Sequence, residues 1–263
     1  MAGKKPEKSE KGAVKSEVLA ERPGKSITRR GNLVFKAFEK GKSKADILNE
    51  ALNQARAEQA GLPAPALREV RANKDGSWAI VMDYVEGRTL DDLMKKDRKN
   101  FDKHLETFVR IHTEVLAHKV ALMNPLTEKL DRQVSASALP EEQRYNLHMQ
   151  LMGLPKNISV CHGDFNPTNV IMLPDGSHRI LDWAHVRRGN ALADIARTYL
   201  YFAVTDQLPI GEKYLDAICA RLKVEKRDVQ KWLPIVAAAQ STKEENAKHV
   251  DLLLHWASVV DYV

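Results

Sequence analysis

The sequence predicts an α+β protein with two lobes, a small β-rich N-terminal lobe with one helix and a larger, mainly α-helical C-terminal lobe that carries a β-hairpin. Strand and turn signals dominate up to residue 85, around a single helical segment. Beyond residue 88 most apolar residues recur at helical spacing. A short strand-forming stretch, residues 158–183, interrupts those helices. We expect the ligand site in the cleft between the lobes.

Length and composition are typical of a globular protein. The chain has 263 residues, of which 43% are apolar and 29% are charged, enough for two closely packed lobes and too apolar for general disorder. No apolar run is long enough to cross a membrane, and the N-terminus has no apolar signal core. Two cysteines, Cys161 and Cys219, cannot form a disulfide framework. We therefore expect a cytoplasmic protein with no membrane partner; its oligomeric state is left open.

Two segments hold the excess of positive charge. Residues 1–16 contain five lysines and two glutamates, and residues 95–103 contain five Lys or Arg and two Asp, a net charge of +3 each. A basic patch can bind nucleic acid, but these segments lack the aromatic interleaving of such sites. We interpret residues 1–16 as a disordered basic tail and residues 95–103 as an exposed helix end, and we expect no nucleic-acid partner.

The N-terminal lobe is assigned to residues 17–85. Its first part predicts short strands separated by turns, and residues 33–38 have a strong strand pattern. A helix with an apolar stripe follows, and Ser43 is its expected cap. Residues 67–72 and 78–84 flank a turn-rich stretch, which indicates a hairpin.

The C-terminal lobe is assigned to residues 86–263. Helical patterns cover residues 89–99, 101–120 and 140–152, and they resume from residue 191 to the end of the chain. The short strand-forming stretch lies between these helices.

That stretch predicts a hairpin with polar side chains at its base. Strands 169–173 and 178–182 flank a four-residue Pro-Asp-Gly-Ser turn, and a symmetric pairing places Asn169 opposite Asp182. Carboxylate and amide oxygens together suit Mg²⁺. Asp164, on the loop that enters the hairpin, is close enough to accept a proton from an attacking hydroxyl.

Each of these residues also has an ordinary structural interpretation. Asp and Asn are common turn formers at strand ends. His162 can serve as a buried histidine bonded to a backbone carbonyl, and Cys161 as a buried strand residue. Lys36, on strand 33–38, can be a charge that protects an edge strand from aggregation.

The order of motifs resembles the aminoglycoside phosphotransferase and choline kinase superfamily, itself similar to the protein kinases. The segment from His162 to Asn169, His-Gly-Asp-Phe-Asn-Pro-Thr-Asn, resembles the catalytic loop, and Ile-Leu-Asp-Trp at 180–183 resembles the metal-binding strand. The resemblance extends over nearly all of residues 17–263. It implies a two-lobed protein-kinase-like fold and an enzyme that uses ATP (or GTP) and Mg²⁺ to phosphorylate a hydroxyl of a small molecule.

The resemblance also implies a role for each matching residue of the loop and hairpin. Asp164 corresponds to the catalytic aspartate, and His162 to the catalytic-loop histidine that braces it. Asn169 and Asp182 correspond to the magnesium ligands. Asp194 corresponds to a structural aspartate that ties the following helix to the loop.

Upstream residues correspond to the nucleotide site. Lys36 resembles the lysine that holds the α- and β-phosphates, and Glu50 its ion-pair partner, with Glu58 as a rival. The backbone of Asp83 and Val85 corresponds to the hinge that binds the base.

One feature departs from the family pattern, and another leaves the substrate open. Gly24 is the sole glycine where the nucleotide loop is expected, at residues 20–27, so the glycine-rich cradle is reduced to one residue. Residues 205–263 contain nine acids and eight Lys or Arg, too balanced for a polycation site overall. The acceptor is therefore an aminoglycoside or an unidentified metabolite. The alternatives are a catalytically weak or inactive nucleotide- or partner-binding module and a protein kinase.

Overall fold

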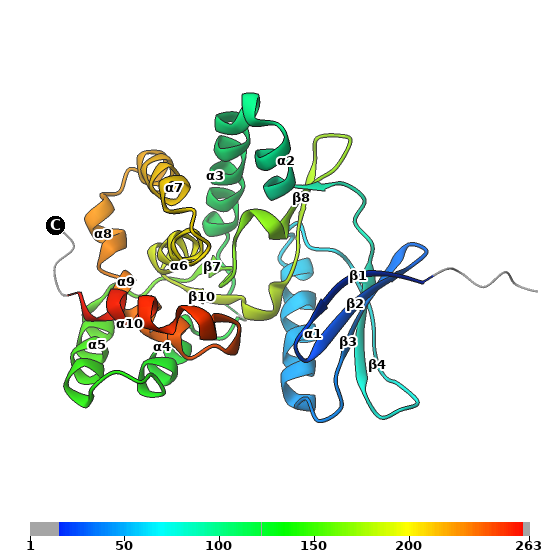
Figure 1. Cartoon of the computed structure of the whole chain (residues 1–263), viewed down its shortest axis with the longest axis horizontal. Coiled ribbons are helices and arrows are strands. Elements are labelled where there is room, and N and C mark those ends of the chain that lie inside the picture. Colours follow the sequence, from blue (N-terminus) through cyan, green and yellow to red (C-terminus); the bar gives the residue numbers. More distant parts are fainter. Residues whose placement is uncertain (1–15, 122, 260–263) are drawn as a thin grey trace, which may run out of the picture. The chain divides into compact units, whose positions relative to one another are not determined.

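The computed structural model describes residues 16–121 and 123–259 (Figure 1). The described chain divides into two compact units, each with its own fold. We call them the sheet unit, residues 16–48 and 66–85, and the helical unit, residues 49–65 and 86–259.

The predicted basic tail, residues 1–16, lies outside the described residues except for Ser16. None of the helices in the described part of the chain has the length and apolar character needed to cross a bilayer.

Five antiparallel strands make up the sheet unit, in the spatial order β1-β2-β3-β5-β4. Two-residue turns join the first three strands, and Gly24 and Gly31 adopt positive φ angles of 75° and 61° in them. Glycine suits these positions because a Cβ disfavours the left-handed region. The strands are β1 (Ser16–Arg22), β2 (Lys25–Arg30), β3 (Leu33–Phe38), β4 (Leu67–Ala72) and β5 (Trp78–Asp83).

Helix α1 (Lys44–Gln59) follows the sheet's third strand and has the predicted cap. The Asp46 N–H donates to Ser43 Oγ at 3.3 Å, which satisfies one of the unpaired donors of the first turn. Gly61, with a φ of 72°, follows the helix end. The boundary between the two units falls inside α1, after Leu48.

The helical unit contains most of the helices and several short strands (Figure 1). Its helices beyond α1 are α2 (Leu90–Lys96), α3 (Phe101–Ala117), α4 (Leu126–Ser135), α5 (Glu141–Gly153), α6 (Ala191–Val204), α7 (Leu208–Leu222), α8 (Lys226–Gln230), α9 (Leu233–Ser241) and α10 (Val250–Ser258). Its strands are β6 (Arg88–Thr89), β7 (Ser159–Cys161), β8 (Val170–Met172), β9 (His178–Ile180) and β10 (Arg187–Gly189).

Helix α4 lies in a stretch for which the sequence analysis predicts no element. Its buried residues Leu126, Leu130 and Val134 recur every four residues, which is the spacing of an amphipathic helix. Pro125 precedes the helix, and proline is well tolerated at a helix start. The amphipathic spacing was therefore present in the sequence, but it extended over fewer than three helical turns.

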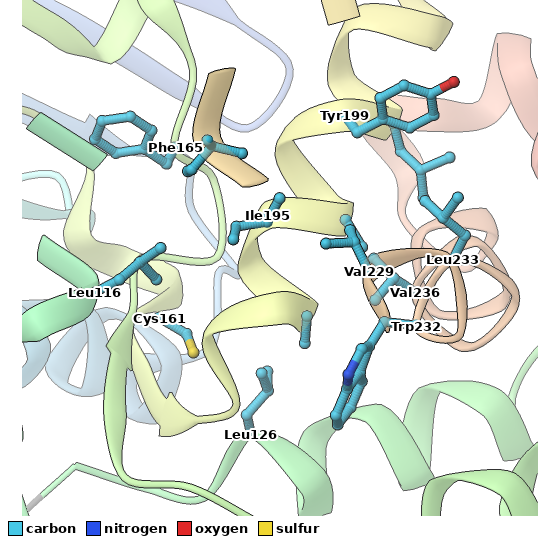
Figure 2. Close-up of a cluster of buried hydrophobic side chains, with 14 of the residues drawn as sticks. Leu116, Leu126, Cys161, Phe165, Ile195, Tyr199, Val229, Trp232, Leu233 and Val236 are labelled. Atoms are coloured by element: carbon cyan, nitrogen blue, oxygen red, sulfur yellow. The ribbon is translucent and has the colours of Figure 1, made fainter. Parts of the chain in front are cut away.

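Helix α6 is the central helix of the core, with ten of its fourteen residues buried. Figure 2 shows Ile195 of α6 between two groups of apolar side chains, Leu116 and Phe165 in one and Val229 and Trp232 in the other. A helix buried on nearly all sides must pair any polar residue that it carries. Asp194 and Arg197 are such residues, with 2% and 7% of their surfaces exposed.

The hairpin of β8 and β9 is present, but its register differs from the predicted one. Val170 pairs with Ile180, and the Leu181 N–H donates to the Asn169 carbonyl at 2.8 Å. Asn169 therefore lies opposite Leu181, and the prediction that it lies directly opposite Asp182 is wrong by one residue.

The turn of this hairpin explains the shift. Ser177 belongs to the ladder, because its carbonyl accepts a hydrogen bond from the Leu173 N–H at 2.9 Å. The loop is therefore three residues long, and its last residue, Gly176, has a φ of 83°. A left-handed glycine at the end of a three-residue loop is a common hairpin geometry.

Candidate active site

Asp194 organises the loop that carries the predicted catalytic residue. Its carboxylate accepts hydrogen bonds from the backbone N–H groups of His162 (2.8 Å) and Gly163 (2.7 Å) and from His112 Nε2 (3.2 Å). Burial alone would raise the pKa of Asp194, but the hydrogen bond and charge of His112 and the Gly163 N–H outweigh it, so that the pKa is lowered. An ionised carboxylate thus connects the start of α6 to the loop.

His162 holds the same loop against the hairpin. Its Nδ1 accepts a hydrogen bond from the Asp164 N–H at 3.2 Å, and its Nε2 donates to the Leu181 carbonyl at 3.0 Å. Burial lowers the pKa of His162, which favours the neutral ring. Because both ring nitrogens bond to backbone groups, this geometry suits a brace and not a proton carrier.

Gly163 has no room for a side chain. Its φ is 79°, and a Cβ there would lie 2.7 Å from the His185 carbonyl oxygen. Both the backbone angle and the close approach therefore require glycine between His162 and Asp164.

Asp164 is held by two donors and remains partly accessible. Its Oδ1 accepts from Arg197 Nη2 at 2.9 Å and its Oδ2 accepts from Asn169 Nδ2 at 3.1 Å, while 23% of its side chain is exposed. A positioned and accessible carboxylate can orient a hydroxyl and accept its proton.

Asn169 and Asp182 have the chemistry of a magnesium site. The amide nitrogen of Asn169 donates to the Asp164 backbone carbonyl (2.9 Å) and to its carboxylate, so the Asn169 Oδ1 is the atom directed to other ligands. Asp182 follows β9 in the left-handed region, with φ 59° and ψ 60°, and its charge acts on both His162 and His185. One amide oxygen and one carboxylate suit Mg²⁺.

These two residues would not complete a coordination shell alone. The described residues contain no group of three or more His, Cys, Asp or Glu placed to hold a metal. A Mg²⁺ ion held by one or two side chains takes its remaining ligands from water and from substrate phosphates, so the donor set fits a metal that binds with a nucleotide.

A polar stripe on α6 faces this loop, and the sequence analysis missed three of its four members. Asp194 is joined by Arg197, by Thr198, whose Oγ1 donates to the Phe165 carbonyl at 2.7 Å, and by Tyr201. Burial and the charges of Asp91 and Asp164 raise the pKa of Tyr201 to about 12. The spacing i, i+3, i+4, i+7 from Asp194 is the signal that could have identified them.

In the sheet unit, Lys36 lies on β3 and is buried, with 5% of its surface exposed. Because β3 pairs with β2 on one side and β5 on the other, the alternative interpretation of Lys36 as an edge-strand charge is wrong. Glu50 and its rival Glu58 are both half-buried on the part of α1 that belongs to the helical unit.

The predicted hinge and nucleotide-loop residues also lie in the sheet unit. The Asp83 N–H donates to the Ala66 carbonyl at 3.0 Å, so this N–H is already bonded within the sheet unit. Val85 is half-buried at the end of this unit. Gly24 forms the turn between β1 and β2, and its N–H and carbonyl both bond to Glu39.

A cavity of about 250 Å³ lies elsewhere in the helical unit, and none of the predicted site residues lines it. Its walls come from the start of α4, the segment before β7 and the end of β10.

Comparison with known proteins supports a single family. The family model described as "Phosphotransferase enzyme family" matches residues 25–233. No curated protein sequence matches the chain.

Solved structures with a similar fold include aminoglycoside phosphotransferases and a choline kinase. A thermostable mutant of aminoglycoside phosphotransferase APH(4)-Ia, in a ternary complex with ADP and hygromycin B, is 13% identical, with a TM-score of 0.69 and 92% of each chain covered. Aminoglycoside-3'-phosphotransferase of type VIII is 17% identical, with a TM-score of 0.66 over 86% of this chain and 94% of that one. Choline kinase LicA from Streptococcus pneumoniae is 17% identical, with a TM-score of 0.61 and 93% of each chain covered. These similarities show a kinase-like α+β fold.

Proposed function

Since the chain belongs to the phosphotransferase enzyme family, we propose that it is a small-molecule kinase that transfers the γ-phosphoryl group of ATP to a hydroxyl group, with Asp164 as the catalytic carboxylate. ATP is the proposed donor because structures of similar fold were solved with ADP or AMP-PNP. The observation that carries the proposal is the Asp164 carboxylate, held by Arg197 and Asn169 yet partly exposed.

The residues of the loop and those that hold it have different proposed roles. Asp164 orients the acceptor hydroxyl and accepts its proton, while Asp194 and His162 keep the loop in place. Asn169 Oδ1 and the Asp182 carboxylate would hold Mg²⁺, which when bound neutralises charge on the nucleotide phosphates. Most of the catalysis in such a site comes from positioning and electrostatics.

Five residues outside the loop complete the proposed nucleotide site. Lys36 would bind the α- and β-phosphates with Glu50 as its partner, and the backbone of Asp83 and Val85 would bind the base. Gly24 would lie near the phosphates at the turn between β1 and β2. For Asp83, the bonded N–H means that the carbonyl would be the acceptor for the base.

Magnesium-linked nucleotide binding tests this function. In a thermal shift assay, AMP-PNP should stabilise the wild type only with Mg²⁺, by about 2.7 kcal/mol at a hundred times the dissociation constant. Asp182→Ala should lose most of that stabilisation. Of the two proposed magnesium ligands, Asn169 and Asp182, only Asp182 carries a charge, so its removal should weaken metal binding most. Asp251→Ala, an exposed residue of α10, is the matched control and should retain it.

The same assay decides against the proposal if magnesium adds nothing to wild-type stabilisation by the nucleotide. A second candidate, a nucleotide-binding module without transfer, is favoured by Gly24, whose backbone N–H already bonds to Glu39. Nucleotide binding together with no transfer of a γ-labelled phosphate to any hydroxyl compound would support that module.

A further inference from the structure

Cationic side chains from four elements of the helical unit and from the link after α9 gather around the segment that follows Asp182. Hydrogen bonds to backbone carbonyls bring α1 and the start of α4 to this segment. The Arg188 N–H at β10 donates to the Asn124 carbonyl just before α4 (3.1 Å), and Asn53 Nδ2 of α1 donates to the Ala184 carbonyl (2.9 Å). We define the cationic cluster as Arg56 of α1, Lys129 and Arg132 of α4, Arg187 of β10, Arg197 of α6 and Lys243, which follows α9.

The members of the cationic cluster act on one another. Burial and then the charges of Lys243, Arg187 and Arg197 lower the pKa of Lys129 to about 7. Burial and then the charges of Arg132 and Arg56 lower the pKa of Arg187. Groups that suppress each other's charge lie close together.

Four of the six cations have no ion-paired carboxylate among the described residues, although the charge of Asp182 acts on the neighbouring His185. Asp194 acts on Lys129, but its carboxylate already accepts three hydrogen bonds from the loop and His112. Arg56, Lys129, Arg132 and Arg187 form no ion pair with a carboxylate in the described part of the chain, whereas Arg197 pairs with Asp164.

Buried guanidinium nitrogens provide an independent indication that a ligand belongs here. Arg56 Nη1 and Arg197 Nε are buried with no hydrogen-bond partner among residues 16–121 and 123–259. An unsatisfied buried donor costs about 1–3 kcal/mol, and more when it is charged. An anionic ligand would satisfy these donors and relieve the repulsion between the cations.

We propose that the acceptor substrate is an anion, a hydroxyl compound that carries a carboxylate or a phosphate monoester, and that the cationic cluster binds this group. The proposal rests on the proposed kinase function. Arg197 connects the two parts of the site, because it belongs to the cluster and its Nη2 lies 2.9 Å from Asp164 Oδ1. Lys129, Arg132 and Arg187 determine the specificity.

The phosphoryl transfer to such an acceptor requires only the nucleotide as co-substrate. The acceptor hydroxyl oxygen forms a bond to the γ-phosphorus as the bond between that phosphorus and the bridging oxygen breaks. The bridging oxygen leaves with the electron pair on the nucleoside diphosphate, and the hydroxyl proton passes to Asp164 and then to solvent. A polycationic acceptor would be repelled by the cluster.

A matched series of candidate acceptors tests the effect of the acceptor's charge. Glycerol, glycerate and glycerol 3-phosphate share a hydroxylated scaffold and differ in the anionic group, and hygromycin B supplies a cationic comparison. Binding is measured by thermal shift without nucleotide and with saturating Mg·AMP-PNP, and transfer is measured with γ-labelled ATP. Glycerate or glycerol 3-phosphate should bind at least tenfold more tightly than glycerol, and the better of the two identifies the anionic group.

Variants of the cationic cluster test whether it causes the preference for anionic acceptors. Lys129→Gln and Arg132→Gln should each reduce anion binding about tenfold or more, which is 1.4 kcal/mol, and Lys129→Arg should restore it. Lys99→Gln, exposed on the 3₁₀ turn Arg98–Asn100, should match the wild type.

Three results would overturn the proposal: neither anion stabilises the protein more than glycerol, hygromycin B is bound or phosphorylated as well as the anions, or Lys129→Gln behaves as Lys99→Gln does. Anion binding in the nucleotide-free arm, with no Mg·AMP-PNP binding, would instead count against the kinase function alone.

Discussion

Asp164 illustrates at the scale of one residue how position creates reactivity. An aspartate at a strand end is ordinary, but this carboxylate receives one donor from α6 and one from the hairpin. Its neighbours are themselves fixed, because Asp194 and His162 bond to the backbone of the same loop.

Asp164→Asn should preserve nucleotide binding and reduce phosphoryl transfer by about 10²–10⁴-fold, since the amide has the same shape but cannot accept the hydroxyl proton. Single-turnover transfer and Mg·AMP-PNP thermal shift measure the two properties. Asp175→Asn, in the exposed turn of the hairpin, is the control and should be fully active. Loss of nucleotide binding in Asp164→Asn would mean that Asp164 is a metal ligand.

The sequence identified local motifs better than convergent ones. Asp164, Asn169 and Asp182 lie within nineteen consecutive positions, and the structure places the first two in hydrogen-bond contact. Arg197 was missed because its contact with Asp164 joins residues that are 33 positions apart. Its helical spacing from Asp194 was visible, but only the bond to Asp164 reveals its role.

At the scale of elements, the hairpin shows where pattern reasoning fails. Strand composition and the glycine-containing turn predicted both strands, yet the loop length decided which residues are opposite each other. A three-residue loop and a four-residue loop fit the same letters, and they differ by one residue in register.

Gly176→Ala should destabilise the protein by about 1–2 kcal/mol, because the alanine must keep the left-handed φ of 83° although no atom blocks its Cβ. Gly153→Ala is the matched control. Gly153 lies at the end of α5, also with open space and without positive φ, so alanine should stabilise by about 0.5–1 kcal/mol. Chemical denaturation compares them, and equal effects would contradict the turn assignment.

At the scale of the whole molecule, the two units were predictable in kind but not in composition. The change from strand to helical pattern predicts a boundary near residue 85, and by internal contacts the sheet unit comprises residues 16–48 and 66–85. That residues 49–65 belong with the helical unit could not be read from periodicity, because a helix has the same pattern whichever unit it packs on.

The cationic cluster should affect global stability through Lys129. Its pKa is lowered from 10.5 to about 7 in the folded protein. Between pH 7 and 10.5, Lys129 is therefore protonated in the unfolded chain but largely neutral in the folded protein. The free energy of unfolding should rise with pH over this range, because the unfolded state binds more protons. Buried Cys161 and Cys219, whose pKa values are raised, oppose the trend near pH 9.

Urea denaturation in chloride buffer measures the free energy of unfolding of the wild type and of Lys129→Met, and the difference between the two is followed as a function of pH. The difference should shift in favour of the wild type between pH 7 and 8.5, by up to about 1.4 kcal/mol per pH unit. Lys99→Met should show no such dependence. A difference independent of pH would mean that Lys129 titrates normally.

The anchoring of the loop by Asp194 has a consequence for how the acceptor could be found. Since the loop backbone is held by Asp194 and His162 and not by the Asp164 proton acceptor, Asp164→Asn should remain a well-formed receptor that cannot turn over. Such a variant is a substrate trap: loaded with Mg·ATP and exposed to a mixture of metabolites, it would retain its acceptor long enough for mass spectrometry to name it.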